Sequence, residues 1–362
     1  MSARFDKYKR RGALAPLLLL CFAFASALAV PESSLALGSR SVRYTAGFRT
    51  ITLWDEQKDI RLEVGIWYPA QRAESQLNIQ DWSLSAAGNA KEASGSFPLV
   101  LLSHDAGGGM LSYHDTAAEL ARQGFVVAAP THNLDNFADS SGVFKPGRIL
   151  DRPYELDLVL SGILGADSLS FIDHNRIAVV GIGTGAATAL SLAGGVPDFA
   201  AYSAYCAGPG IGEPYCSALA QQRMDAASYL PESFDLPRVR ISALVLAAPA
   251  YGMFFTRAGL AAVKQPTLVF AVKTDSLNKS ASHADLIIRN LPAPPEVIRL
   301  EEDAVDLLAP CADYIIDFDG LACLPPDEKL LRERYADFNA SLAVFLKSRL
   351  GGPLPASAKA AH

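Results

Sequence analysis

Three alternating glycines stand where a tight turn joins a buried strand to a helix. The stretch 176–187 reads as an apolar strand, a turn that contains Gly181, Gly183 and Gly185, and the start of a helix. In α/β proteins such a turn commonly presents a nucleophile or a phosphate-binding group. This turn contains neither serine nor lysine. Its chemistry therefore depends on the side chains that the rest of the chain brings to it.

Three interpretations of this turn are open. Gly181, Gly183 and Ala186 match the dinucleotide-binding fingerprint, but that fold needs an acidic residue at the end of the next strand, and the chain continues instead into a Gly- and Pro-containing segment at 194–199. The spacing Gly-x-Gly-x-Gly also matches a nucleophile elbow, Gly-x-Ser-x-Gly, whose central serine is replaced by Gly183. The third interpretation is a turn that uses glycine for packing alone.

The elements around the turn predict a mainly parallel, doubly wound α/β sheet with antiparallel strands at its N-terminal edge. Alternating strands are expected at 43–54 and 60–68, a long surface loop at 71–96, and a cap insertion at about 195–240. A helix is expected to open at Arg152-Pro153, with the proline in its first turn. Buried strands are expected at 98–102, 124–129, 177–180, 244–247, 267–272 and 296–300, and further helices at 116–122 and 330–346.

The first 29 residues have the composition of a signal peptide. Basic residues at 4–11 precede an apolar run at 17–24, and Ala27-Leu28-Ala29 fits a small-x-small cleavage site. We expect an exported protein, periplasmic or secreted, with one domain over 30–350 and a disordered tail at 351–362.

Cleavage would remove five basic side chains and one acidic side chain, which changes the formal charge from −6 to −10. An acidic protein is a poor partner for nucleic acid, and no later stretch is long and apolar enough to cross a bilayer. Four cysteines would remain, in two close pairs without Cys-x-x-Cys spacing. In an oxidising compartment they predict the disulfides Cys206–Cys216 and Cys311–Cys323 rather than a metal site.

Several short motifs in a fixed order resemble the α/β-hydrolase superfamily, and more narrowly its bacterial dienelactone hydrolase and platelet-activating-factor acetylhydrolase-like branch. The similarity runs from about Arg61 to the last helix. The motifs are Trp67-Tyr68-Pro69-Ala70, Leu101-Leu102-Ser103-His104, the strand 124–130, Arg152-Pro153, Ala204-Tyr205-Cys206 with Cys216, and Ala309-Pro310-Cys311 with Cys323.

The resemblance implies a catalytic triad that is degenerate in this chain. The family's nucleophilic serine falls on Gly183, its aspartate on Asp275 and its histidine near Ala304. The family's oxyanion loop, Ser-His-Gly-x-Gly-Gly, corresponds to residues 103–108, and the pocket positions in and beside it are His104, Asp105, Ala106 and Thr184. A carboxylate has therefore entered a loop that should stabilise negative charge.

The loss of the base also follows from the order of the residues. The fold places nucleophile, acid and histidine in that order, and only His283 and His362 follow Asp275. His283 belongs to the segment directly after the acid's strand, and His362 ends the tail. Thr184 is expected to lend its backbone N–H to the oxyanion hole, and without a histidine its hydroxyl is a poor nucleophile.

The sequence thus predicts a catalytically inactive pseudo-hydrolase that binds a small molecule or a protein partner, without cofactor or metal. The alternative is an active ester or acyl hydrolase with a non-standard nucleophile. A third possibility is a carboxylate site for calcium or acid–base chemistry, formed by Asp105 and Asp275 with Glu301, Glu302, Asp303 and Asp306, although a solvated loop is the simpler interpretation. A histidine against a Ser, Thr or Cys side chain at the sheet rim would overturn the inactive reading.

Overall fold

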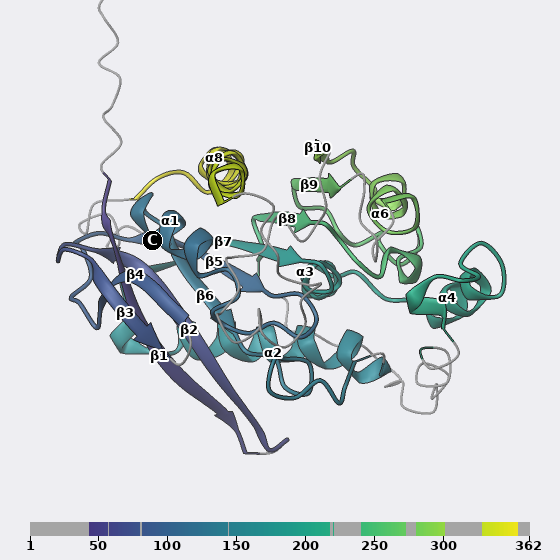
Figure 1. Cartoon of the computed structure of the whole chain (residues 1–362), viewed down its shortest axis with the longest axis horizontal. Coiled ribbons are helices and arrows are strands. Elements are labelled where there is room, and N and C mark those ends of the chain that lie inside the picture. The colour runs from purple at the N-terminus through teal and green to yellow at the C-terminus, as the bar shows by residue number, and fades with distance from the viewer. Residues whose placement is uncertain are drawn as a thin grey trace, which may run out of the picture. The chain divides into compact units, whose positions relative to one another are not determined.

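The described part of the chain forms a ten-stranded sheet with the order β10-β9-β8-β7-β5-β6-β2-β1-β4-β3 (Figure 1). The structure is a computed structural model that describes residues 43–56, 58–79, 82–143, 145–217, 220, 240–272, 280–300 and 328–353. The strands are β1 (Thr45–Asp55), β2 (Ile60–Ala70), β3 (Ser75–Ile79), β4 (Trp82–Gly88), β5 (Phe97–Ser103), β6 (Val126–Pro130), β7 (Ile172–Ile182), β8 (Ala243–Ala247), β9 (Thr267–Val272) and β10 (Glu296–Leu300).

The six strands from β10 to β6 are parallel, and β2 joins them antiparallel through β6. β5 and β8 are buried along their whole length, because helices cover both faces of this part of the sheet. The prediction of a mainly parallel sheet with antiparallel N-terminal edge strands is confirmed. The carboxyl ends of β5, β6 and β7 meet at one edge, where the strand order reverses and α/β proteins usually bind their ligands.

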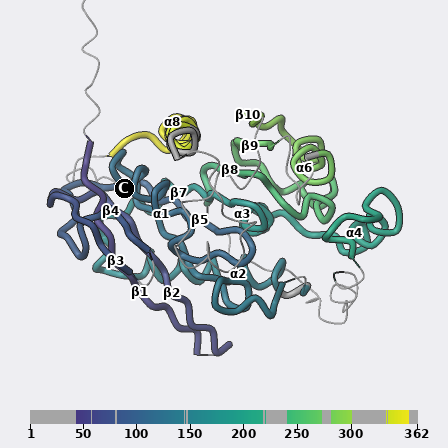
Figure 2. The backbone as a smooth tube through the Cα atoms, in the orientation of Figure 1, coloured from purple at the N-terminus to yellow at the C-terminus, as the bar shows by residue number. Residues whose placement is uncertain are grey.

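Two hydrophobic cores lie on opposite faces of the sheet. One packs helices α2 (Pro146–Leu164), α3 (Gly185–Leu192) and α6 (Ala284–Asn290) against one face, and the other packs α1 (His114–Arg122) and α8 (Glu328–Leu350) against the other. The backbone trace shows α2 and α8 on opposite sides of the strands (Figure 2). The remaining described helix is α4 (Phe199–Cys206), and short 3₁₀ turns lie at Asp167–Leu169, Pro214–Cys216, Gly252–Phe254 and Ser280–Ser282.

The expectation of a long surface loop at 71–96 is wrong. This segment contains β3 and β4, which pair antiparallel with each other, and β4 also pairs parallel with β1. Leu84 and Ala86 of β4 are buried, whereas Ser83 and Ser85 are exposed. The alternation is therefore present, but its small and polar residues conceal it.

The expected start of α2 is also wrong. The helix begins at Pro146, so Pro153 lies inside it, two turns after the start. Pro146 is the residue that fits the first helical position, because its missing N–H has no partner to lose there. Starting the helix earlier places Arg152 within it and directs this side chain into the protein, where it is 1% exposed.

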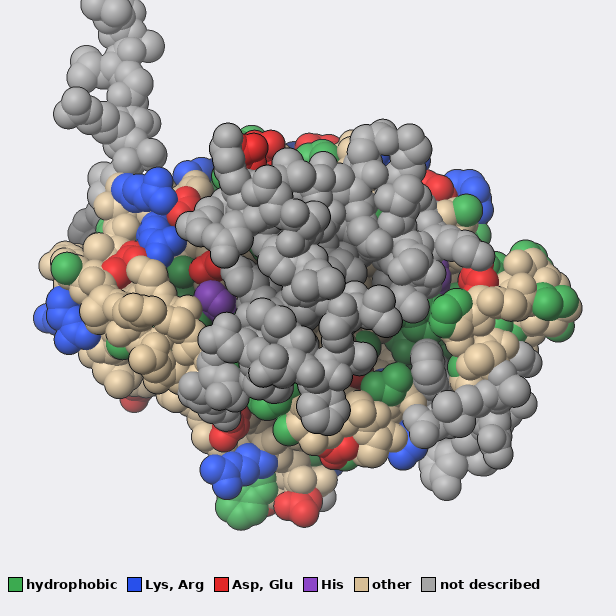
Figure 3. Space-filling model, viewed as in Figure 1, with side chains coloured by type: hydrophobic (Ala, Val, Ile, Leu, Met, Phe, Trp, Pro, Cys, Tyr) green, Lys and Arg blue, Asp and Glu red, His purple; other side chains and the backbone are tan. Residues whose placement is uncertain are grey.

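The predicted disulfide Cys206–Cys216 is present and links the end of α4 to the turn at Pro214–Cys216. Other expectations lie outside the described residues: the signal peptide at 1–29, the pair Cys311 and Cys323, the segment 221–239 of the cap, and the tail beyond residue 353. In the described ranges, no helix has both the length and the apolar composition that crossing a membrane requires. Figure 3 shows acidic and basic side chains interspersed among the described residues of one face.

Candidate functional site

The turn between β7 and α3 has the backbone of a nucleophile elbow. Gly183 adopts the left-handed conformation with φ +56°, which disfavours any residue with a side chain. A Cβ on Gly181 would run into the backbone of Gly185, so strand and helix approach more closely than other residues would allow. The turn therefore has the tight strand-to-helix geometry of an elbow, with no side chain at its apex.

The carboxyl group of Asp105 occupies the apex instead. A Cβ built on Gly183 would lie 1.9 Å from the carboxyl carbon of Asp105 and 2.1 Å from each of its carboxyl oxygens. Oδ1 of Asp105 accepts hydrogen bonds from the backbone N–H of Thr184 and of Ala106, both at 2.7 Å. These two N–H groups are the donors that an oxyanion hole in this fold supplies, one after the nucleophile and one from the loop after β5. The Asp105 carboxyl group thus occupies the position where this fold would form an oxyanion hole.

The charge of Asp105 is balanced by its surroundings. Burial raises the pKa of the Asp105 carboxyl above its ordinary value, against the opposing effects of the hydrogen bonds from Thr184 and Ala106 and of the positive charge on Arg152. Two hydrogen bonds from fixed backbone groups hold one oxygen in place without any movement of the chain. Burial therefore favours the neutral carboxyl group, whereas the two N–H groups and Arg152 favour the carboxylate.

Arg152 ties together the loops that surround the elbow. Its Nη1 donates to Thr184 Oγ1 at 2.8 Å and to Asp135 Oδ2 at 3.1 Å. Its Nη2 donates to the carbonyl oxygen of His104 and, at 3.2 Å, to Ser103 Oγ. Because Asp135 also accepts from the Gly107 N–H at 3.1 Å, one buried ion pair fixes both the loop after β5 and the loop after β6.

His104 is a buried, neutral member of this network. Its Nε2 accepts from the backbone N–H of His132 at 3.1 Å, so its proton is on Nδ1, which lies 2.6 Å from the carbonyl oxygen of Asp105. Burial and then the charge of Arg152 lower the pKa of His104 to about 3. This histidine supports the backbone of Asp105 and is not directed at the elbow.

The structure also contains a Ser–His–Glu arrangement that the sequence reasoning missed. His132 Nε2 lies 2.9 Å from Ser103 Oγ, and His132 Nδ1 lies 2.7 Å from Glu155 Oε2. These are the contacts of a catalytic triad, with the correct nitrogen toward each partner. Residue order alone excludes His132, because this histidine precedes the elbow. The available signal was that Ser103 ends β5 and His132 follows β6, its neighbour in the sheet.

This arrangement is closed to solvent. Ser103 and His132 are 0% exposed and Glu155 is 1% exposed. Burial lowers the pKa of His132 well below its ordinary value and raises the pKa of Glu155 to about 7. His132 is therefore neutral, donating from Nδ1 to Glu155 and accepting the Ser103 proton at Nε2. This contact is the one that the sequence analysis named as able to overturn the inactive interpretation, a histidine against a serine at the end of a strand. Because Ser103 and His132 are fully buried, catalysis through this pair requires the site to open.

A strained loop closes the other side of the elbow. Ala248 and Tyr251, after β8, have φ values of 42° and 59°, and such conformations in residues with side chains concentrate at functional sites. Between them, the Ala250 N–H donates to the Gly183 carbonyl at 2.9 Å. Tyr251 packs edge-on against Tyr215 of the disulfide-bonded segment, with ring centroids 5.0 Å apart. The elbow is thus attached to the cap through aromatic contacts.

The remaining predicted site residues cannot be placed. Asp275, Ala304 and the acidic residues between 301 and 306 lie outside the described residues, so the predicted acid and histidine positions are untested. Among the residues that are described, no group of three or more His, Cys, Asp or Glu side chains is arranged to hold a metal ion.

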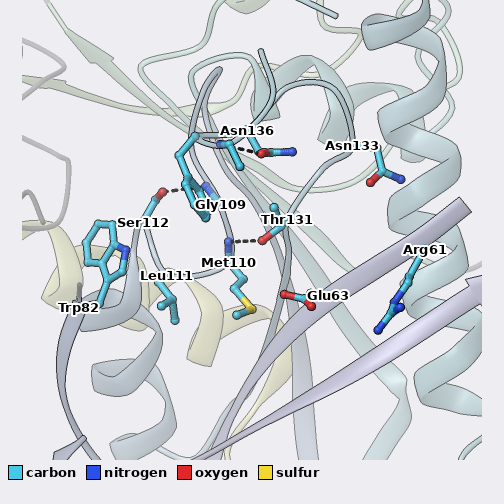
Figure 4. Close-up of a pocket in the computed structure, with 12 residues that line it drawn as sticks. Arg61, Glu63, Trp82, Gly109, Met110, Leu111, Ser112, Thr131, Asn133 and Asn136 are labelled. Atoms are coloured by element: carbon cyan, nitrogen blue, oxygen red, sulfur yellow. Dashed lines mark hydrogen bonds between the residues drawn. The ribbon is translucent and has the colours of Figure 1, made fainter. Parts of the chain in front are cut away.

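A cavity of about 270 Å³ opens at the same edge of the sheet, next to the loop after β5 (Figure 4). It lies between the start of β2, Trp82 of β4, the segment 109–112 and the loop 131–138. Asp105, Gly183 and Thr184 do not line it. The cavity is therefore distinct from the elbow.

Comparisons with known proteins support the fold. The chain is similar to a solved structure of a ferulic acid esterase from Streptomyces cinnamoneus, with a TM-score of 0.58 and 16% sequence identity over 87% of this chain and 92% of that one. No protein-family model and no curated protein sequence matches the chain. At this identity the likeness shows the fold alone. Strand order, elbow and structural similarity together define a protein with the α/β-hydrolase fold.

Proposed function

We propose that this chain is a pseudo-hydrolase: an exported α/β-hydrolase-fold protein that has lost serine-triad catalysis and acts by binding a small molecule or a protein partner. One observation carries the proposal. The carboxylate of Asp105 occupies the space where the nucleophilic side chain would lie, and it accepts hydrogen bonds from the two N–H groups that would stabilise an oxyanion.

Each part of this arrangement opposes ester hydrolysis. Loss of the nucleophile alone costs about six orders of magnitude in the best-dissected serine enzyme. Occupation of the oxyanion hole adds to this loss, because removing a single donor costs roughly 10²- to 10³-fold. A negative charge at that position also repels the charge that develops in the transition state.

The sequence motifs favour the bacterial dienelactone hydrolase and platelet-activating-factor acetylhydrolase-like branch as the source of this scaffold. Export is supported by the basic and apolar segments before Ala29 and by the Cys206–Cys216 disulfide, which suits an oxidising compartment.

The test is a hydrolase assay with p-nitrophenyl acetate and butyrate, together with labelling by a fluorophosphonate probe. The purified protein should show neither turnover nor labelling. The combined variant Gly183→Ser, Asp105→Gly and Ala304→His should gain esterase activity, because it restores the nucleophile, empties the hole and supplies the base. The same combination without Gly183→Ser is the control and should stay inactive. Robust turnover by the unmodified chain would refute the proposal.

The second candidate function is ester hydrolysis through Ser103, favoured by the contacts between Ser103, His132 and Glu155. It requires the buried site to open to substrate. Ser103→Ala would then abolish activity and probe labelling. Ser96→Ala is the matched control, since Ser96 is a buried serine beside the other end of β5. Activity lost only in Ser103→Ala would replace the pseudo-hydrolase proposal with this one.

A further inference from the structure

Hydrogen bonds join the two loops that line the cavity beside the loop after β5. The Phe137 N–H donates to the Gly108 carbonyl at 3.1 Å, and the Met110 N–H donates to Thr131 Oγ1 at 3.0 Å. A Cβ on Gly109 would meet the ring of Phe137 at 3.0 Å, so the aromatic ring lies directly on the backbone of the facing loop. The two loops therefore hold the cavity open in one shape.

The lining of this cavity is polar at one end and apolar at the other. Trp82 and Leu111 lie on one side, and Arg61 and Asn133 lie on the opposite side (Figure 4). Glu63 and Met110 lie between these two ends. A ligand that fits this lining has a charged head and an apolar tail.

Arg61 at the polar end and Glu63 in the middle of the cavity carry opposite charges. Arg61 and Glu63 are two residues apart on β2, so their side chains leave the same face of the strand. Neither side chain makes an ion pair or a hydrogen bond with any residue that the structure describes. Both are exposed at the mouth of a cavity whose other walls are mainly apolar. Such a pair is able to receive a cation and an anion from one molecule.

We infer that this cavity binds a free α-amino acid with a large apolar side chain. The guanidinium of Arg61 would take the carboxylate, for which its planar fork is suited. Glu63 would take the ammonium group, and the side chain would lie against Met110 and Trp82. The volume of about 270 Å³ is just below the roughly 300–1,000 Å³ of sites for drug-sized ligands, so the occupant is small.

This inference rests on the binding role in the proposed function but not on the loss of catalysis. Serine-esterase activity in the unmodified chain would defeat the pseudo-hydrolase proposal and leave the amino-acid site unaffected. Failure to bind amino acids would defeat the site and leave the filled oxyanion hole unaffected. The two measurements are therefore independent.

The experiment is isothermal titration calorimetry of the full chain with L-phenylalanine, L-leucine and L-methionine. Phenylalaninamide, which lacks the carboxylate, and N-acetylphenylalanine, which lacks the ammonium group, should each bind at least about tenfold more weakly than phenylalanine. Arg61→Gln and Glu63→Gln should weaken phenylalanine binding by a similar factor. Both positions are exposed, so circular dichroism should show an unchanged fold.

The matched controls remove the same charges elsewhere on the surface. Lys91→Gln and Asp167→Asn are exposed, do not line the cavity, and should bind phenylalanine like the unmodified chain. No binding of any of the three amino acids at concentrations up to about 10 mM would overturn the inference. Equal affinity in the unmodified chain, Arg61→Gln and Glu63→Gln would overturn it as well.

Discussion

The occupation of the elbow by Asp105 predicts an energetic coupling between two residues that are 78 positions apart. The perturbation is Gly183→Ala, which adds only the Cβ that the carboxyl group now displaces. The left-handed backbone at Gly183 costs an alanine about 1–2 kcal/mol. The methyl group must also move the Asp105 carboxylate away from Thr184 and Ala106.

The second cost follows from those two hydrogen bonds. A hydrogen bond to a charged group contributes about 1.5–3 kcal/mol, and because Asp105 is partly exposed, water recovers part of this, leaving about 1–3 kcal/mol for the pair. Gly183→Ala should therefore destabilise the protein by about 2–5 kcal/mol. Asp105→Ala should cost about 1–3 kcal/mol, because it removes the same hydrogen bonds.

In the double variant this loss is counted once. The double variant Gly183→Ala, Asp105→Ala should be about 1–3 kcal/mol more stable than the summed costs of the two single variants predict. The assay is equilibrium unfolding in urea, followed by circular dichroism, for all four proteins. Gly212→Ala is the control, because Gly212 has φ +87° with open space around it and measures backbone strain alone. Costs of Gly183→Ala and Asp105→Ala that add within about 0.5 kcal/mol would refute the reasoning.

Three further predictions concern the network and the cap. Arg152→Met should lower the unfolding free energy in urea by about 3–5 kcal/mol, because it leaves the buried Asp135 without its charged partner. The control Arg43→Met breaks an exposed ion pair with Glu119 and should cost less than about 1 kcal/mol. Equal costs of the two substitutions would contradict this prediction. The pKa of His104 is lowered from 6.5 to about 3. Between these pH values the unfolded chain binds a proton at this residue and the folded chain does not. The resulting stability is therefore fully present above pH 6.5 and is lost as the pH falls. The unfolding free energy should fall by up to about 1.4 kcal/mol for each pH unit. This pH dependence should be smaller in His104→Asn and unchanged in the control His174→Asn, whose side chain is exposed. Identical pH profiles in the two variants would argue against a neutral buried His104. Replacing Cys206 and Cys216 together by alanine should lower the unfolding free energy by about 3 kcal/mol, because the bridge spans only 10 residues, and a change below about 1 kcal/mol would show that the cap contributes little to the global transition.

Most of the sheet could be predicted because its central strands carry their own signal. β5, β9 and the second half of β7, from Ile177, are mainly apolar runs that only a sheet covered on both faces can bury. β3 and β4 were missed because Ser, Asn and Ala dominate them and their apolar residues are few. Pro153 misled the placement of α2, because a proline inside a helix is rarer than one in its first turn.

The candidate site was less predictable because its contacts join segments that are distant in sequence. The sequence placed Asp105 in the oxyanion loop but not its oxygen on the Thr184 N–H, which depends on how the loop is held by Asp135 and Arg152. The contact of His132 with Ser103 needs β5 and β6 to be neighbours with aligned ends. Propensity and spacing give no information on such pairings.

The carboxylate on the Thr184 and Ala106 N–H groups stands where the acid released by an esterase would sit after each turnover. A free acid leaves by diffusion, whereas Asp105 is covalently part of the chain and its local concentration never falls. The proposed pseudo-hydrolase would therefore resemble a product-inhibited enzyme from which the product cannot leave. Under the proposed function, phosphonates and boronates that target esterases would meet this tethered acid and no nucleophile at Gly183, so the protein would serve as a negative control for such reagents.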